Sequence, residues 1–162
     1  QIISREDDKD VDAFEIMMGD VLEISDVLRD WESRFPVLAY LDRSPDLLSQ
    51  DVHSRQDIMA NLTADDFAAA RARADAMQAA YAALETKADA CITLTAPGPA
   101  TIGMPTGDAS FLDPCSVIGN PALTLPLLAS GGLPLGVQLG GFDYQDRRLV
   151  AQGLWLRDFV LA

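Results

Sequence analysis

Cysteine and histidine are almost absent from this chain of 162 residues, which contains only Cys91, Cys115 and His53. Two cysteines do not make a disulfide framework, and these three residues together are too few for a metal site. We therefore expect no metal, and the sequence gives no reason to expect a cofactor. Cys91 lies in a short apolar segment, where a buried, reduced thiol is the usual state, so we expect a cytoplasmic protein.

Long apolar runs and positive charge are also lacking. No apolar run reaches the roughly 18 residues of a membrane span, and the N-terminus, Gln1 to Arg5 followed by acidic residues, does not resemble a signal peptide. The absence of an initial methionine is consistent with a fragment or a processed chain.

The net charge is −13: residues 1–66 hold 17 acidic and 6 basic side chains, and residues 67–162 hold 8 and 6. This balance excludes nucleic acid and membranes as expected partners and indicates a solvated acidic helical face.

Apolar residues spaced alternately three and four apart predict a helix after a charged connector at residues 1–12. This helix is expected to run from about Phe14 to about Arg34, with Gly19 as a weak point inside it. Pro36 is expected to end it, because proline removes a backbone donor and disfavours helical geometry in the residue before it.

Two further helices are expected before residue 88. The first begins at Ser44-Pro45-Asp46, a hydroxyl cap followed by proline and an acid, and it stops near Asn61. The second opens at Thr63-Ala-Asp-Asp66, which resembles a capping box. Its small residues Ala70 and Ala74 indicate close packing against another element rather than a coiled coil.

After Lys87 the pattern changes from helical to β. A buried strand is expected at residues 90–95, a long loop at 96–120, an antiparallel hairpin with strands at 122–127 and 135–139, and a last helix opening at residues 143–146. The fold class is therefore α/β. Three strands with exposed edges make a poor sheet on their own, so we infer that they belong to a larger sheet whose other strands come from elsewhere.

The residues needed for hydrolysis by a nucleophile do not assemble in this sequence. The reaction needs a nucleophile, a base and oxyanion donors, but no Ser-Ser pair and no Gly-x-Ser-x-Gly elbow is present. The surroundings of Lys9 and Lys87 indicate surface residues, and His53 has no predicted nucleophile beside it. Cys115 lies in the long loop without an evident histidine partner, and Ser130-Gly131-Gly132 is expected to be a hairpin turn. We therefore expect no catalytic residue in this chain.

The long loop instead predicts one wall of a pocket. It leaves the end of a strand, where ligands bind in open α/β sheets, and its prolines limit its flexibility. Thr95 offers a hydroxyl, and Ile102 and Met104 offer apolar contacts; a rigid surface loop is the alternative. Asp108 and Asp113 could act as an acid/base pair, but an aspartate beside glycine or proline more often forms a turn.

Four segments in the second half follow one another in a specific order. They are Asp89 to Pro97, ending in Thr-Ala-Pro; Thr106-Gly-Asp108; Gly119-Asn-Pro-Ala122 with Pro126; and Gly132-Leu-Pro-Leu-Gly-Val-Gln-Leu139. Their order and spacing resemble the C-terminal half of the amidase-signature family of amide hydrolases. The first half matches more loosely, through Phe14-Glu15 and residues 62–71.

The resemblance implies that residues 1–162 are the C-terminal portion of a single domain with a mixed sheet, mainly helical over 13–87 and carrying the strands and pocket loop over 88–162. Family members hydrolyse amides with two serines and a lysine, the second serine following a cis peptide bond, and all three lie in the N-terminal half. No position here matches them. The resemblance makes Thr95, Ile102, Met104 and Cys115 the candidate pocket residues.

The implied partners are a small-molecule amide substrate and the missing N-terminal half of the same protein, and a homo-oligomer would also cover exposed strand edges. The chain taken alone is expected to be inactive. The alternative is a free-standing, non-catalytic binding or assembly module that retains the C-terminal fold. The third hypothesis, an unrelated helical protein with a hairpin, would place Cys91 and Leu125 in separate domains.

Overall fold

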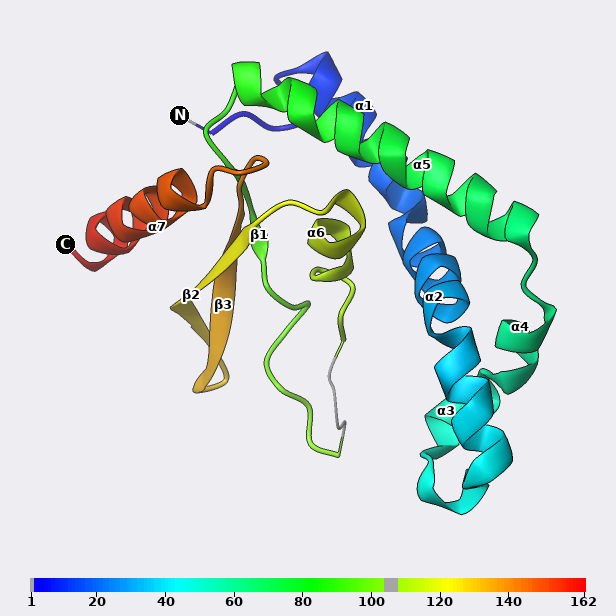
Figure 1. Ribbon diagram of the computed structural model, residues 1–162. Helices are drawn as coiled ribbons and strands as arrows, with labels where there is room; N and C mark the ends of the chain where they lie inside the picture. Colours follow the sequence, from blue (N-terminus) through cyan, green and yellow to red (C-terminus); the bar gives the residue numbers. More distant parts are fainter. Residues whose placement is uncertain (1, 104–107) are drawn as a thin grey trace.

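A computed structural model describes residues 2–103 and 108–162 (Figure 1). The helices are α1 (Lys9–Met17), α2 (Val21–Arg43), α3 (Gln50–Ser54), α4 (Gln56–Asn61), α5 (Ala64–Ala83), α6 (Asp113–Ile118) and α7 (Asp146–Leu161). The strands are β1 (Cys91–Leu94), β2 (Ala122–Ser130) and β3 (Leu133–Gly140), and 3-10 turns lie at Met18–Asp20, Pro45–Leu47 and Leu84–Thr86. The predicted α/β class is confirmed.

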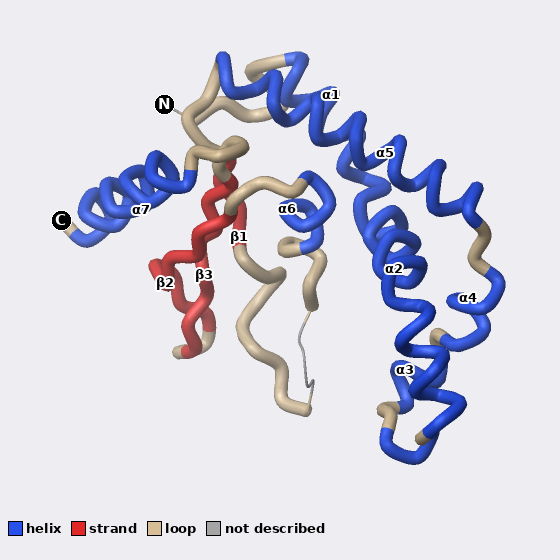
Figure 2. The backbone as a smooth tube through the Cα atoms, viewed as in Figure 1, coloured by secondary structure: helices blue, strands red, loops and turns tan. Residues whose placement is uncertain are grey.

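The elements form successive layers (Figure 2). Helix α7 lies on one side of the sheet, and α6 with the loop at residues 95–112 lies on the other. Beyond α6 lie α2 to α5, residues 21–83, which we call the helical arm. None of the described helices is long and apolar enough to cross a membrane.

The sheet has the strand order β1-β3-β2, and both pairs are antiparallel. The predicted hairpin is confirmed. Gly131 and Gly132 have φ angles of 58° and 80°, the left-handed region that a tight hairpin turn requires. The register of β2 shifts between Leu125 and Leu128. Pro126 lies in this shifted segment, and proline is tolerated there because β2 is an edge strand of the sheet.

The core lies where α5 meets α1, α2 and α6. Ala70, Ala74, Met77 and Tyr81 are buried along one face of α5, so the small residues do allow close packing as the sequence predicts. The Tyr81 ring lies 5.4 Å from Phe14 and 5.1 Å from Phe142, measured between centroids, and its hydroxyl donates to the Gly140 carbonyl at 2.9 Å. Tyr81 therefore joins the helical arm to the end of β3.

The capping box at the start of α5 is confirmed. The Asp66 amide donates to the Thr63 hydroxyl at 3.2 Å, and the Thr63 amide donates to the Asp66 carboxylate at 2.9 Å. Hydrogen bonds to the Asp66 carboxylate from the Thr63 hydroxyl, at 2.6 Å, and from the Thr63 amide lower the pKa of Asp66 because they stabilise its charged form. Arg71 and Asp75 form an ion pair at 2.9 Å on the exposed face of α5.

The first predicted helix differs from the structure in three ways. Helix α1 begins at Lys9, within the predicted connector, because the Asp8 side chain accepts hydrogen bonds from two amides of its first turn. The helix breaks around Gly19, the predicted weak point. The expectation that Pro36 ends the helix was wrong, because α2 continues through it to Arg43. An interior proline removes one hydrogen bond, and here the turns after Pro36 remain helical, with Leu41 buried among them.

The second predicted helix, from Ser44 to Asn61, is not continuous. Pro45 starts only a 3-10 turn, and the Ser44 side chain makes no capping bond. Two short helices follow, meeting at Arg55, and the second ends at Asn61 as predicted. The break places Arg55 at a corner that faces α2.

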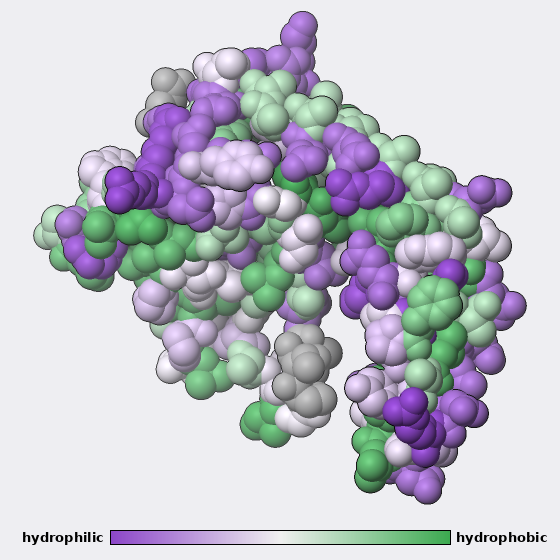
Figure 3. Space-filling model, in the orientation of Figure 1, coloured by the Kyte–Doolittle hydropathy of each residue, from purple (hydrophilic) through white to green (hydrophobic). Residues whose placement is uncertain are grey.

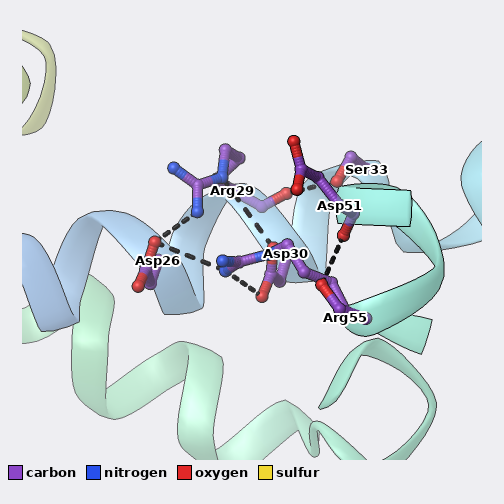
Figure 4. Close-up of polar contacts among 7 residues, drawn as sticks. Asp26, Arg29, Asp30, Ser33, Asp51 and Arg55 are labelled. Carbon is purple, nitrogen blue, oxygen red and sulfur yellow. Dashed lines mark hydrogen bonds and ion pairs between the residues drawn. The ribbon is translucent and has the colours of Figure 1, made fainter. Parts of the chain in front are cut away.

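Arg55 makes a buried ion pair with Asp30 that ties α2 to the α3–α4 corner (Figure 4). Asp30 is only 1% exposed, and its carboxylate accepts from Arg55 Nε at 2.9 Å and from Arg55 Nη2. Asp26 lies 3.3 Å from the same guanidinium. The hydrogen-bonded Asp30 carboxylate raises the pKa of Arg55. The sequence indicated only an arginine stem along an apolar seam, so the ion pair is a finding of the structure.

Two expectations for the second half were also wrong. Residues 96–120 are not one loop, because Asp113–Ile118 form α6, with Pro114 in its first turn. Strand β1 is not buried: Cys91 is exposed and Ile92 is 48% exposed. Within the described residues β1 pairs only with β3, so its outer edge and much of its surface face solvent.

Candidate functional site

The two faces of the sheet have different chemistry because side chains alternate along each strand. One face carries the apolar residues Ile92, Leu94, Leu123, Leu125, Val137 and Leu139. Helix α7 covers part of it, and Gly153 allows the close approach: a β-carbon there would lie 2.3 Å from Leu123 Cδ2. The opposite face, which we call the polar face, carries Cys91, Thr93, Thr95, Ala122, Thr124, Gly136, Gln138 and Gly140.

One end of the polar face is buried and the other is open. At the buried end, a β-carbon on Gly140 would lie 2.9 Å from Asn120 Nδ2 and 3.1 Å from the Tyr81 hydroxyl oxygen. At the open end, Thr95 Oγ1 donates to Thr124 Oγ1 at 3.3 Å, and both side chains lean over Gly136. A solvent-accessible pair of hydroxyls therefore stands where β1 runs into the loop.

The loop at residues 95–112 begins and ends on β3. The Thr95 amide donates to the Gly136 carbonyl at 2.9 Å. The Phe111 carbonyl accepts from Gln138 Nε2 at 3.0 Å. Figure 3 shows an open notch between the part of the molecule that contains the sheet and loop and the far end of the helical arm. The surface is hollowed there, beside the loop.

The structure brings two of the four sequence-predicted pocket residues together. Thr95 lies on the polar face, and Cys115 Sγ lies 3.5 Å from Gln138 Nε2 on the same face. Ile102 is fully exposed. Met104 lies outside the described residues.

Cys115 has the environment of a structural thiol. It is half-buried in the first turn of α6, and burial raises its pKa while a hydrogen bond from Asn120 opposes that shift. A raised pKa keeps the thiol protonated at neutral pH, and the thiolate is the nucleophilic form. Cys115 can thus line a wall but is poorly suited to attack a substrate.

The remaining candidates have local structural roles. Asp108 accepts from the Ser110 amide at 2.8 Å, as expected of a turn former, and the Ser110 hydroxyl together with this amide lowers the pKa of Asp108. His53 is exposed, with Nε2 2.9 Å from the Pro45 carbonyl oxygen. Lys87 pairs with Asp8 at 2.7 Å and so ties the start of α1 to the end of α5.

The sequence interpretation missed the polar partners that organise this face, namely Asn120, Thr124, Gly136 and Gln138. Asn120 and Gln138 are both buried, and Asn120 Nδ2 donates to the Gly141 carbonyl at 3.1 Å. A single amide side chain within an apolar strand, and an asparagine directly before a proline, were available signals. Buried amides of this kind are normally kept by specific hydrogen bonds.

A separate concavity lies away from the polar face. It is a half-open groove of about 240 Å³ between α1 and α5, lined mainly by Ala13, Phe14, Met17, Ala80 and Leu84. Its wall is apolar apart from Asp10. The groove offers no set of polar groups that could orient a ligand, so we place the candidate site on the polar face.

Comparisons of the fold give consistent neighbours. One solved structure, titled as an amidase, has 25% sequence identity and a TM-score of 0.79, covering 87% of this chain and 36% of its own. A bacterial aryl acylamidase of the amidase-signature enzymes has 14% identity and a TM-score of 0.63, covering 81% of this chain and 32% of its own. A 6-aminohexanoate cyclic dimer hydrolase has 22% identity and a TM-score of 0.54, covering 78% and 33%.

No protein-family model matches the chain, and no curated protein matches it. The chain spans about a third of the length of the solved structures that it matches. The fold is that of amidase-signature enzymes, and the share covered is consistent with a C-terminal part of that fold. The resemblance stated from the four sequence segments is therefore confirmed.

Proposed function

We propose, from the amidase-signature fold of this chain, that it is the C-terminal, pocket-forming part of a hydrolase that cleaves carboxamide C–N bonds. The observation that carries the proposal is the match over 87% of this chain to about a third of a solved amidase. The catalytic serines and lysine would come from an N-terminal half of the same protein. Residues 1–162 are then part of one domain rather than a domain of their own.

In this proposal the polar face and its loop form one wall of the substrate pocket. The hydroxyls of Thr95 and Thr124 can each donate and accept a hydrogen bond, which suits both the carbonyl and the N–H of a carboxamide. Gly136 leaves the floor between them open. Cys115 lines the deeper part of the wall as a protonated thiol, and Ile102 and Met104 would supply apolar contacts to a small-molecule substrate.

The partner half would cover two apolar surfaces that this chain leaves open. One is the outer edge of β1, where Ile92 is 48% exposed and the strand contains no proline or charged residue that would disfavour pairing with another strand. The other is the outer side of α7, where Trp155 and Phe159 stack on each other while 66% and 70% exposed. Adding a strand at β1 would satisfy the free backbone groups of that strand. The N-terminal half would also bury Trp155 and Phe159 on α7. A second copy of the chain is the competing occupant.

We expect the purified 162-residue chain to hydrolyse no carboxamide, because the described residues contain no activated nucleophile. The full protein that contains it is expected to release amine from small carboxamides. Both are measured by amine release from the same panel of aryl and alkyl amides. Turnover by the isolated chain, abolished by changing one of its own residues, would contradict the proposal that the catalytic residues come from the N-terminal half.

The alternative module makes a different prediction for the gene. A coding sequence upstream of Gln1 with a glycine-rich Ser-Ser segment and an earlier lysine supports the hydrolase. A start codon close to Gln1, together with a chain that forms a defined oligomer by light scattering and binds amides without turnover, supports the non-catalytic module.

A further inference from the structure

Gln138 is a buried polar residue in strand β3, and the apolar residues beside it do not explain why it is polar. It is 3% exposed, in the middle of β3, with Val137 and Leu139 on either side of it in the sequence. Burying an amide side chain carries a desolvation penalty unless its hydrogen bonds are replaced. An apolar residue would fill the same space without that penalty, so the contacts of Gln138 should reveal its role.

The contacts of the Gln138 amide all lead away from the sheet. Nε2 donates to the Phe111 carbonyl at 3.0 Å, at the end of the loop, and lies 3.5 Å from Cys115 Sγ in α6. Two residues earlier on the same strand, the Gly136 carbonyl accepts from the Thr95 amide, where the loop starts. Both ends of the loop therefore meet neighbouring positions of β3, and Gln138 holds the returning end.

We propose that Gln138 is a positioning residue that closes the base of the loop and thereby sets substrate affinity. It acts through the loop: with Phe111 bound to Gln138, the returning segment stays on the polar face that also carries Thr95 and Thr124. This inference rests on the proposed function for its effect on substrate. Its effect on the loop does not depend on that function.

The arrangement predicts a local effect rather than a general one. The end of α6 is held separately, because Asn120 donates to the Gly141 carbonyl at 3.1 Å and the Gly141 amide donates to the Pro121 carbonyl at 2.8 Å. Ile118 is also buried in the core. Loss of the Gln138 bond should therefore free residues 108–112 while α6 and the hairpin stay in place.

The test is Gln138→Met in the full protein, which keeps the length of the side chain and removes its donor. Hydrogen exchange of the amides at residues 108–112 is expected to rise about tenfold, the size of effect produced by leaving one buried carbonyl unpaired. Amides of β2 and β3 should exchange as in the unmodified protein. With a small carboxamide as substrate, KM should rise about tenfold while kcat changes less than twofold.

Gln152→Met is the matched control. Gln152 Nε2 donates to the Asp89 carbonyl at 2.9 Å and ties α7 to the start of β1, on the other side of the sheet. It should change neither exchange at 108–112 nor KM. Unchanged loop exchange in Gln138→Met, or an equal rise throughout β2 and β3, would overturn the positioning role. Increased loop exchange with unchanged KM would overturn the claim that Gln138 sets substrate affinity. A full protein that hydrolyses no amide would refute the proposed function, and the hydrogen-exchange result alone would then decide whether Gln138 positions the loop.

Discussion

Replacing Arg55 with methionine is expected to destabilise the full protein by about 3 kcal/mol, because it removes both hydrogen bonds to the buried Asp30 carboxylate and leaves only Arg29 Nε, 3.8 Å away, to pair with it. Asp30 is 1% exposed, so water cannot replace the lost bonds without opening the contact between α2 and α4. The expected loss of stability is at the low end of the range for broken buried pairs because the Arg55 side chain is already 29% exposed to solvent. Urea unfolding, followed by tryptophan fluorescence, measures the loss.

Arg71→Met is the control, since Arg71 makes an exposed pair with Asp75 at 2.9 Å. Such pairs contribute about 0.5 kcal/mol or less, so this variant should unfold almost as the unmodified protein does. The double change Asp30→Leu with Arg55→Met removes both charges and should recover most of the stability. A loss below about 1 kcal/mol in Arg55→Met would show that Asp30 is not held by this pair.

Adding a single methyl group at Gly136 is expected to lower kcat/KM of the full protein by roughly 10- to 100-fold, the effect of displacing a positioning group by about 1 Å. The new β-carbon would lie 2.5 Å from Thr95 Oγ1, 3.1 Å from Thr95 Cβ and 2.7 Å from Thr124 Cγ2. Both threonines are branched at the β-carbon, and their backbones are fixed beside β3, Thr124 within β2 and Thr95 through its amide bond to the Gly136 carbonyl, so neither can move aside freely. The hydroxyl pair must therefore separate, at a cost to stability of about 1–3 kcal/mol.

Amine release and urea unfolding of Gly136→Ala measure both effects. Gly19→Ala carries the same substitution at a position with no atom within 4 Å of the new β-carbon, and it should keep full activity. Activity of Gly136→Ala within twofold of the unmodified protein would show that the hydroxyl pair is not part of the pocket wall.

Local sequence signals predicted the elements whose causes are local. Thr63 and Asp66 are three residues apart and cap each other directly, and Gly131-Gly132 supplies the conformation that the hairpin turn needs. Pro36 shows where this logic fails, because α2 continues through it to Arg43 despite the hydrogen bond that proline removes. The start of α6 did carry a signal, Pro114 in the first turn, but a six-residue helix is too short for periodicity to reveal.

Only one side of the candidate site could be predicted from the sequence. Thr95 follows a strand into a proline-rich loop, and that pattern indicates a pocket wall. Its partner Thr124 is 29 residues away, and Gln138 is 27 residues from Phe111. Asp30 and Arg55 are separated by 25 residues in the same way. Such pairs depend on strand order and helix crossing, which no single segment of this sequence encodes.

The attachment of both loop ends to one strand has a consequence for redesign. Since Thr95 and Phe111 are each bound to β3, the span between them is set by the sheet and not by the number of residues in the loop. Lengthening a flexible loop whose ends are fixed adds only about 0.6 kcal/mol per doubling of its length. Segments grafted between these two attachment points should leave the sheet intact, so the loop can be exchanged as a unit without redesigning the strands that hold it.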